Sequence, residues 1–331
     1  MLPHISPGNE MRIVYLDQCA LSNIALDSKN KDWETIGALL ESLTKKRLAA
    51  CPISTESLIE TAALPLWEQR DQRPEIAALM ESISGGLEFM DDFEMIAVQA
   101  VSLARSGNPL QESAIKKRAS DPQHVTTGKF LNLSKMISER CAQVTQTTNR
   151  VLDARPNRDI LREKDKENLG RATKRYMQEI AEALRNHRGT AWTGPILSPI
   201  KSKTVAHKVA ASILSKANLS EEATAGLSKR IAMCNTIDLP YFWLTDELFD
   251  RVLLSKSAKL KKGDLIDFQR LTTALPYSDL IITDGPMKIA AETINLKLIS
   301  KRPPHIFSSS PKDTPEIISL LSEWDKTHPR A

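Results

Sequence analysis

The sequence lacks the cysteine patterns of a structural zinc site or of a disulfide framework. Its four cysteines are far apart and form no CxxC pair and no Cys/His pair with zinc-ligand spacing. We therefore expect reduced and mostly buried thiols at Cys19, Cys51, Cys141 and Cys234.

Long apolar runs are also absent from the sequence. No stretch of about 18 uninterrupted apolar residues occurs, and the start "MLPHISPGNEMR" lacks the basic and apolar regions of a signal peptide. We expect no membrane span and a cytoplasmic location.

The two glycines of "SGGLEF" (84–89) are not followed by the lysine of a phosphate-binding loop, so they predict a turn.

The composition that is present is that of a soluble globular protein. The chain has 331 residues, of which 41% are hydrophobic and 26% are charged. This length exceeds that of an average single domain and predicts a main domain with a second module or a large insertion.

Charge is unevenly distributed along the chain. Residues 105–208 hold 21 Lys and Arg against 10 Asp and Glu, a net charge of +11, whereas the whole chain has +4. This segment is a candidate surface for a polyanion such as RNA, because neutralised phosphates release counterions. A helical segment with solvated basic residues explains the same charge equally well.

The first 90 residues alternate between strand and helix patterns. Short apolar runs at 11–17 ("MRIVYLD") and 48–54 ("LAACPIS") predict strands, and the segments at 20–47 and 55–70 have helical periodicity. Ser54 or Thr55 is a typical N-cap for the second helix. This order predicts a parallel sheet with right-handed crossovers.

The middle of the chain has a different character. It carries helical periodicity without a convincing strand, and the α/β pattern returns later with strands expected at 280–284 ("LIITD") and around 296–300 ("LKLIS"). We expect residues 1–90 to form the first part of one α/β domain, 91–250 a basic all-helical insertion, and 251–331 the second part and a C-terminal tail.

Two carboxylates follow predicted strands. Asp17 ends the first strand and Asp284 ends the strand "LIITD". Ligands of an open parallel sheet bind at the C-terminal edge of its strands, where the strand order reverses, so we expect these two acids to meet there.

Two helices supply further acids. Glu60 lies beside an apolar stripe, whereas Glu56, one turn earlier, is explained by the helix dipole, so we favour Glu60 as the site acid. Asp264 and Asp267, in "GDLIDFQRL", share a helix face; one is explained as a cap, and we expect at least one at the site.

Asp279 has another explanation. It precedes the strand that Asp284 follows, in the turn-forming sequence "PYSD", so we expect a turn residue at the opposite end of the sheet.

A site that gathers several carboxylates needs cations to offset their repulsion. Oxygen ligands suit Mg²⁺ or Mn²⁺, whereas zinc usually brings His or Cys. Two such ions about 4 Å apart can activate a water and stabilise a leaving oxygen in phosphodiester hydrolysis.

The order of the acidic motifs along the chain resembles that of the PIN-like domain family. The motifs are "YLDQCALS", "PISTESLIE", "GDLID" and "IITD", and the resemblance covers roughly residues 10–90 and 260–303. The resemblance implies a parallel sheet flanked by helices and ribonuclease activity with Mg²⁺ or Mn²⁺. The matching positions are Asp17, Glu60, Asp264 or Asp267, and Asp284, and Ser22 matches a small hydroxyl often found near the first acid. The sequence departs from the family in having Cys19 near the first acid and Thr283 directly before Asp284.

The leading hypothesis is therefore a metal-dependent endoribonuclease with a toxin-like or RNA-processing role. In it, Asp17, Glu60, Asp264, Asp267 and Asp284 form the catalytic set, and Asp17, Glu60, Asp267 and Asp284 hold the metal. Basic residues expected to contact nucleic acid are Lys116, Lys117, Arg118, Arg171, Lys174 and Arg175. The alternatives are a catalytically inactive PIN-like module that binds nucleic acid or protein, and a nuclease for single-stranded or flapped DNA. An inhibitory protein partner and self-association both stay open.

Overall fold

A computed structural model describes residues 11–27, 30–64, 71–119, 121–153, 158–186, 202–217, 220–253, 264–300 and 302–326. The chain divides into two compact units. Unit 1 comprises Met1–Phe89, Ile115–Val151 and Lys259–Ala331, and unit 2 comprises Met90–Ala114 and Leu152–Ala258. Residues 115–151, which we had expected within the helical insertion, thus cluster with unit 1.

Unit 1 is built on a parallel sheet, as the alternation of strand and helix patterns predicted. Among the described residues it has four strands in the order β2-β1-β5-β6. They are β1 (Arg12–Leu16), β2 (Ala49–Ala50), β5 (Leu280–Thr283) and β6 (His305–Ser308). The pairing aligns Val14 with Leu280, and Leu280 with His305.

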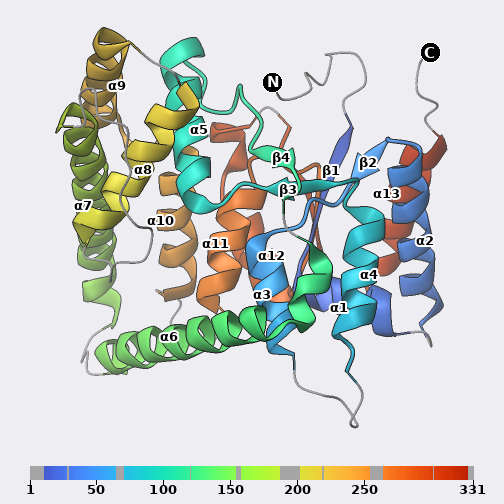
Figure 1. Ribbon diagram of the computed structural model, residues 1–331. Helices are drawn as coiled ribbons and strands as arrows, with labels where there is room; N and C mark the ends of the chain where they lie inside the picture. The colour runs from blue at the N-terminus through green and yellow to red at the C-terminus, as the bar shows by residue number, and fades with distance from the viewer. Residues whose placement is uncertain are drawn as a thin grey trace. The chain divides into compact units, whose positions relative to one another are not determined.

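Helices flank this sheet in unit 1 (Figure 1). They are α1 (Gln18–Leu26), α2 (Lys31–Lys45), α3 (Thr55–Ala63), α4 (Arg73–Ile83), η1 (Pro122–Thr126), α6 (Gly128–Asp153), α11 (Asp264–Ala274), α12 (Gly285–Glu292), η3 (Leu296–Leu298) and α13 (Thr314–Lys326). Local signals explain several boundaries. Asn30 and Ser54 accept backbone N–H groups as the N-caps of α2 and α3, and α3 ends at Ala63, two residues before Pro65.

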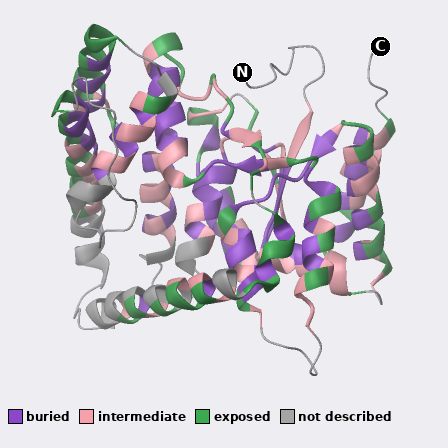
Figure 2. Cartoon of the chain, in the orientation of Figure 1, coloured by how far each residue is buried: buried purple, intermediate pink, exposed green. Residues whose placement is uncertain are grey.

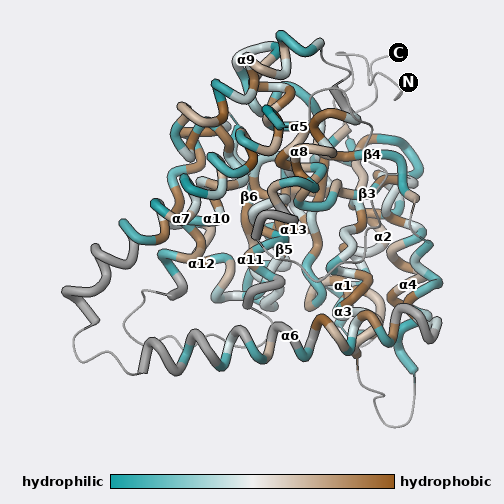
Figure 3. The backbone as a smooth tube through the Cα atoms, turned by 60° about the vertical axis from the view of Figure 1, so that its left-hand side comes forward, coloured by the Kyte–Doolittle hydropathy of each residue, from teal (hydrophilic) through white to brown (hydrophobic). Residues whose placement is uncertain are grey.

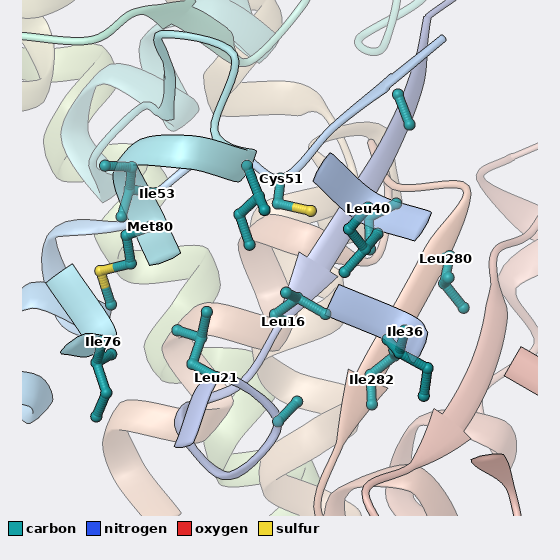
Figure 4. Packing of buried hydrophobic residues seen from close by; sticks show 14 of the residues in the cluster. Leu16, Leu21, Ile36, Leu40, Cys51, Ile53, Ile76, Met80, Leu280 and Ile282 are labelled. Carbon is teal, nitrogen blue, oxygen red and sulfur yellow. The ribbon is translucent and has the colours of Figure 1, made fainter. Parts of the chain in front are cut away.

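The main core of unit 1 covers one face of the sheet. Side chains alternate along a strand, and Leu16, Leu280 and Ile282 are buried on the same face. Figure 4 shows these residues beside Ile36 and Leu40 of α2. Burial of each such side chain contributes about 1.5–3 kcal/mol, so this face fixes the register of β1 and β5. Figure 2 shows the buried strands between helices that are exposed on their outer sides.

Two expectations for the strands were wrong. The segment around 296–300 forms the 3₁₀ helix η3, and the last strand of the sheet is β6, several residues later. The middle of the chain also contributes a strand, β4 (Ile115–Lys117), which pairs antiparallel with β3 (Leu87–Phe89).

The turn expected at "SGGLEF" connects α4 to β3. Gly85 and Gly86 have φ of 60° and 73°, a backbone conformation that side chains with a Cβ disfavour. The two glycines therefore serve this tight turn, with no phosphate-binding sequence beside them.

Unit 2 is helical in its described residues. Its helices are α5 (Asp92–Ser106), α7 (Arg158–Asn186), α8 (Ser202–Ala217), α9 (Glu221–Met233), η2 (Thr236–Asp238) and α10 (Pro240–Leu253). They share a core of their own, which includes Ile96, Met177, Val209, Leu227 and Phe242. Figure 3 shows the hydrophobic positions of these helices interrupted by hydrophilic ones, as expected for amphipathic helices around one core.

No described helix combines the length and the apolar character needed to span a membrane. The cysteines whose side chains are described, Cys19, Cys51 and Cys234, are free thiols. Cys51 is buried in the core of unit 1, as expected, whereas Cys19 and Cys234 are partly exposed.

Candidate metal centre

The strand order of unit 1 reverses between β1 and β5, because β2 follows β1 on one side of it and β6 follows β5 on the other. Asp17 directly follows β1, and Asp284 directly follows β5. The backbone N–H of Asp17 donates to the carbonyl of Ile282, 2.9 Å away. Both acids thus lie at the carboxyl edge where such sheets bind ligands.

Three carboxylates from distant parts of the chain converge at this edge. One oxygen each from Asp17, Glu60 and Asp267 lies within 4.8 Å of the other two. Asp17 is the N-cap of α1, Glu60 lies on α3, and Asp267 lies on α11, one turn after that helix starts. Of the four predicted metal ligands, Asp17, Glu60 and Asp267 thus come together, whereas Asp284 is not among the carboxylates of this group.

Hydrogen-bond donors contact both oxygens of the Asp17 carboxylate. One oxygen accepts from the backbone N–H of Gln18 at 2.6 Å, and the other accepts from the Thr283 hydroxyl at 3.2 Å. The Cys19 thiol lies 3.6 Å from this second oxygen. Burial, and next the charge of Asp17, raises the pKa of Cys19 to about 12, so the thiol stays protonated. The two residues that depart from the PIN-like pattern thus both act as donors to Asp17.

Sequence reasoning missed the cation at the centre of the cluster. Arg270 lies on α11 at i+3 from Asp267, and its side chain is 0% exposed. Its Nη1 atom is 3.0 Å from Asp17, 2.6 Å from Glu60 and 3.8 Å from Asp267. The only sequence signal is that Arg270 shares a helix face with Asp267, and such a spacing is common on solvated helices.

The pKa values of two acids of the cluster, Asp267 and Glu60, are raised. Burial raises the pKa of Asp267 to about 8, with the charges of Asp17 and Glu60 adding to the effect and Arg270 opposing it. Burial also raises the pKa of Glu60, and the Arg270 charge opposes this shift. Without a further cation, Asp267 thus holds its proton at neutral pH.

Neighbouring polar groups tie the first helices to the cluster. The Thr61 hydroxyl, next to Glu60, donates to the side chain of Gln18 at 3.0 Å. The Gln18 amide lies 3.4 Å from the Ser22 hydroxyl, so Ser22 supports Gln18. These contacts connect α1 and α3 beside the carboxylates that the two helices present.

The other predicted acids occupy distinct positions. Asp284 caps α12 by accepting from the Met287 N–H at 2.8 Å, and its charge contributes to the raised pKa of Asp267. Asp264 is the first residue of α11, and its side chain lies outside the described residues. Asp279 binds Arg12 and the N–H of Ile13 at the opposite end of the strands, as expected.

The basic residues proposed for nucleic acid fall in both units. In unit 1, Lys117 is exposed, whereas Lys116 pairs with Glu88 and Arg118 pairs with Glu81. In unit 2, the exposed basic residues described on α7 include Arg171, Lys174 and Arg175. Arg171 and Arg175 form ion pairs with acids one turn along the same helix.

The ligand chemistry of the triad fits a hard divalent cation. Asp17, Glu60 and Asp267 offer only oxygen, and with Arg270 they carry a formal charge of −2 when ionised. Mg²⁺ or Mn²⁺ would neutralise that charge, and both prefer carboxylate oxygens. Burial raises the pKa of both Glu60 and Asp267, the neighbouring carboxylates add to the effect, and Arg270 opposes it.

Comparison of the chain with models of protein families, with curated proteins and with solved structures found no match.

Proposed function

We propose that the protein is a metal-dependent nuclease that hydrolyses phosphodiester bonds of RNA. In this proposal Asp17, Glu60 and Asp267 hold Mg²⁺ or Mn²⁺, with Asp284 beside them. The observation that carries it is the convergence of three carboxylates from three segments at the edge where the strand order reverses.

The residues of the cluster have separate tasks in this chemistry. A bound divalent ion supplies an activated water and stabilisation of the leaving oxygen. Thr283 and the Gln18 N–H keep Asp17 in a fixed orientation, and Glu60 and Asp267 must release any proton they hold before they can act as ligands. No histidine is needed as a general base.

RNA is proposed as the substrate because the order of the acids resembles that of PIN-like ribonucleases. A polyanion also suits the basic residues of β4 and α7, of which Lys117, Arg171, Lys174 and Arg175 are exposed. Single-stranded or flapped DNA is the alternative substrate. RNA and DNA oligonucleotides of one sequence, incubated with the protein and Mn²⁺, distinguish the two.

The experiment that tests the proposal compares Asp17→Asn with Asp279→Asn. Both change an aspartate next to the same sheet, but Asp279 lies at the opposite edge and binds Arg12. We expect Mn²⁺-dependent cleavage of single-stranded RNA by the wild type and by Asp279→Asn, and none by Asp17→Asn. Equal cleavage by the wild type and by Asp17→Asn would assign the activity to another site or to a contaminant.

A second candidate function is favoured by Arg270. Its guanidinium already lies among the three carboxylates, so the cluster can be read as an internal ion network in a protein that only binds nucleic acid or another protein. Addition of Mn²⁺ separates the two functions by its effect on thermal unfolding. A metal site raises the unfolding temperature by mass action, whereas a closed ion network leaves it unchanged.

A further inference from the structure

Arg270 differs from an ordinary counter-ion in how completely it is enclosed. Its side chain is 0% exposed, and Phe268 and Leu271 of the same helix are also buried. Its Nε and Nη2 atoms are buried without a hydrogen-bond partner among the described residues. The acids around Nη1 are therefore the groups that balance this charge.

Because its side chain is fully buried, Arg270 remains beside the acids of the cluster. Moving the guanidinium into water would disturb the packing of α11, because Phe268 and Leu271 of the same helix are buried as well. Burial of a charge is tolerated only where it is paired. Arg270 thus stays with Asp17 and Glu60 whether or not another cation is present.

The position of Nη1 is that of a bridging cation. It lies 2.6 Å from Glu60 and 3.0 Å from Asp17, and so joins carboxylates from α3 and from the end of β1. In nucleases that use two metal ions, a cation at such a point is one of a pair about 4 Å apart. Here a side chain of the protein provides it.

We propose that Arg270 replaces one ion of a two-metal centre and limits this site to a single divalent ion. The inference rests on the proposed function and makes it more specific. Arg270 is then a positioning residue that holds Asp17 and Glu60 in place, and the ion would be held by carboxylate oxygens of Asp17, Glu60 and Asp267. With Asp267 ionised, one divalent ion brings the three acids and Arg270 to neutrality, whereas a second would leave a charge of +2.

The test counts Mn²⁺ ions bound per full-length chain, by calorimetric titration and by native mass spectrometry. The variants are Arg270→Met, which removes the charge, and Arg270→Lys, which keeps it. Arg12→Met is the matched control, because Arg12 also pairs with an aspartate, Asp279, but at the opposite end of the strands.

We expect one Mn²⁺ in the wild type, in Arg270→Lys and in Arg12→Met, and two in Arg270→Met. Electron paramagnetic resonance checks the count, because two ions at this distance couple magnetically. Two ions in the wild type or in Arg270→Lys would overturn the inference and leave the metal-dependent nuclease intact. A single ion in folded Arg270→Met would also overturn it.

Two further outcomes are decisive. If Arg270→Met does not fold, the wild type and Arg270→Lys still decide the count, because the inference requires one ion in each. If the wild type binds no Mn²⁺ at all, both the inference and the proposed metal site fail, which distinguishes this result from a count of two.

Discussion

Asp267 and Arg270 lie one turn apart on α11, and burial disfavours the charged form of both, but their neighbours affect them differently. Asp267 retains its proton at neutral pH because burial and two neighbouring carboxylates disfavour its charge. Arg270 stays charged, because Asp17 and Glu60 surround its Nη1. The chemistry of the cluster therefore depends on how many cations it contains.

The raised pKa of Asp267 predicts how stability depends on pH. The folded protein holds this proton up to about pH 8, whereas an unperturbed aspartate releases it near pH 3.8. Between these values the folded state binds more protons than the unfolded state, so stability falls as the pH rises. With EDTA present, we expect the unfolding temperature of the wild type to drop by about 4 °C or more between pH 6 and pH 9.

Asp267→Asn is the control for this measurement by differential scanning fluorimetry. It should show a much smaller drop over the same range, because the titrating group is gone. Mn²⁺ should bind more tightly to the wild type at pH 8 than at pH 6, because metal and proton compete for Asp267. A parallel pH dependence in the wild type and the variant would contradict the assignment.

At the level of single residues, the sequence allowed the acids to be predicted but not the arginine. Asp17 follows an apolar strand and Glu60 borders an apolar stripe, so both positions are visible in the pattern. Arg270 is buried by α11 packing against distant segments, and an arginine in a helical pattern is normally solvated. Only the three-dimensional structure brings it to Glu60, 210 positions away.

At the level of elements, the sheet places the site because β1 and β5 are neighbours although more than 260 residues separate them. Their sequences are short apolar runs, which periodicity identifies readily. The segment at 296–300 is equally apolar but forms η3, because local backbone hydrogen bonds such as that from Ile299 to Leu296 close a turn there. Pattern alone does not separate a short strand from a short turn of helix.

Helix α3 provides a matched pair of acids for testing the metal site. Glu60 contacts Arg270, whereas Glu56 lies one turn earlier, in the first turn. We expect Glu60→Gln to weaken Mn²⁺ binding by at least the roughly 10–100-fold that loss of an outer-shell partner costs, and Glu56→Gln to change it little. Calorimetric titration of both variants is the measurement. Equal weakening in the two would mean that general charge, and not ligation, sets the affinity.

The loop after β6 provides a test of the fold that is independent of the metal. Asp313 accepts from the N–H and the hydroxyl of Ser308 and from Lys288 of α12. These bonds lower its pKa to about 2, although partial burial opposes the shift. The stabilisation is therefore present above about pH 4 and is lost as the pH falls toward 2.

Asp313→Asn should consequently destabilise the protein at pH 7 by about 1–3 kcal/mol in the free energy of unfolding. Urea denaturation measures this difference. Glu323→Gln is the control, since Glu323 is an exposed acid of the neighbouring helix α13. A loss as large in the control as in Asp313→Asn would show that net charge, and not the bonds of Asp313, is responsible.

At the level of the whole molecule, the described residues form two cores, one for each unit. The change from α/β to helical character was visible in the sequence and led us to expect an insertion at 91–250. The structure assigns residues 115–151 to unit 1, where β4 pairs with β3. A three-residue strand such as β4 has too little periodicity to be identified from the sequence. The assignment of residues 115–151 to unit 1 was therefore not predictable.

Binding of RNA by unit 2 is testable through α7. Replacing Arg171, Lys174 and Arg175 by Gln should weaken binding of single-stranded RNA and make its dependence on salt shallower, by about 2 in the slope of log K against log salt concentration. Fluorescence anisotropy at several salt concentrations measures both. The control replaces three exposed lysines of unit 1, namely Lys45, Lys297 and Lys326. The same loss in the control would mean that only net charge matters.

The central claim is that Asp17, Glu60 and Asp267 form a metal site. Anomalous X-ray diffraction from a crystal grown or soaked with Mn²⁺ tests it most directly. We expect an anomalous peak within about 2.0–2.4 Å of carboxylate oxygens of these three residues. We also expect the peak to disappear in Asp17→Asn. Wild-type crystals with no peak at the cluster, or with Mn²⁺ bound only elsewhere, would contradict the account.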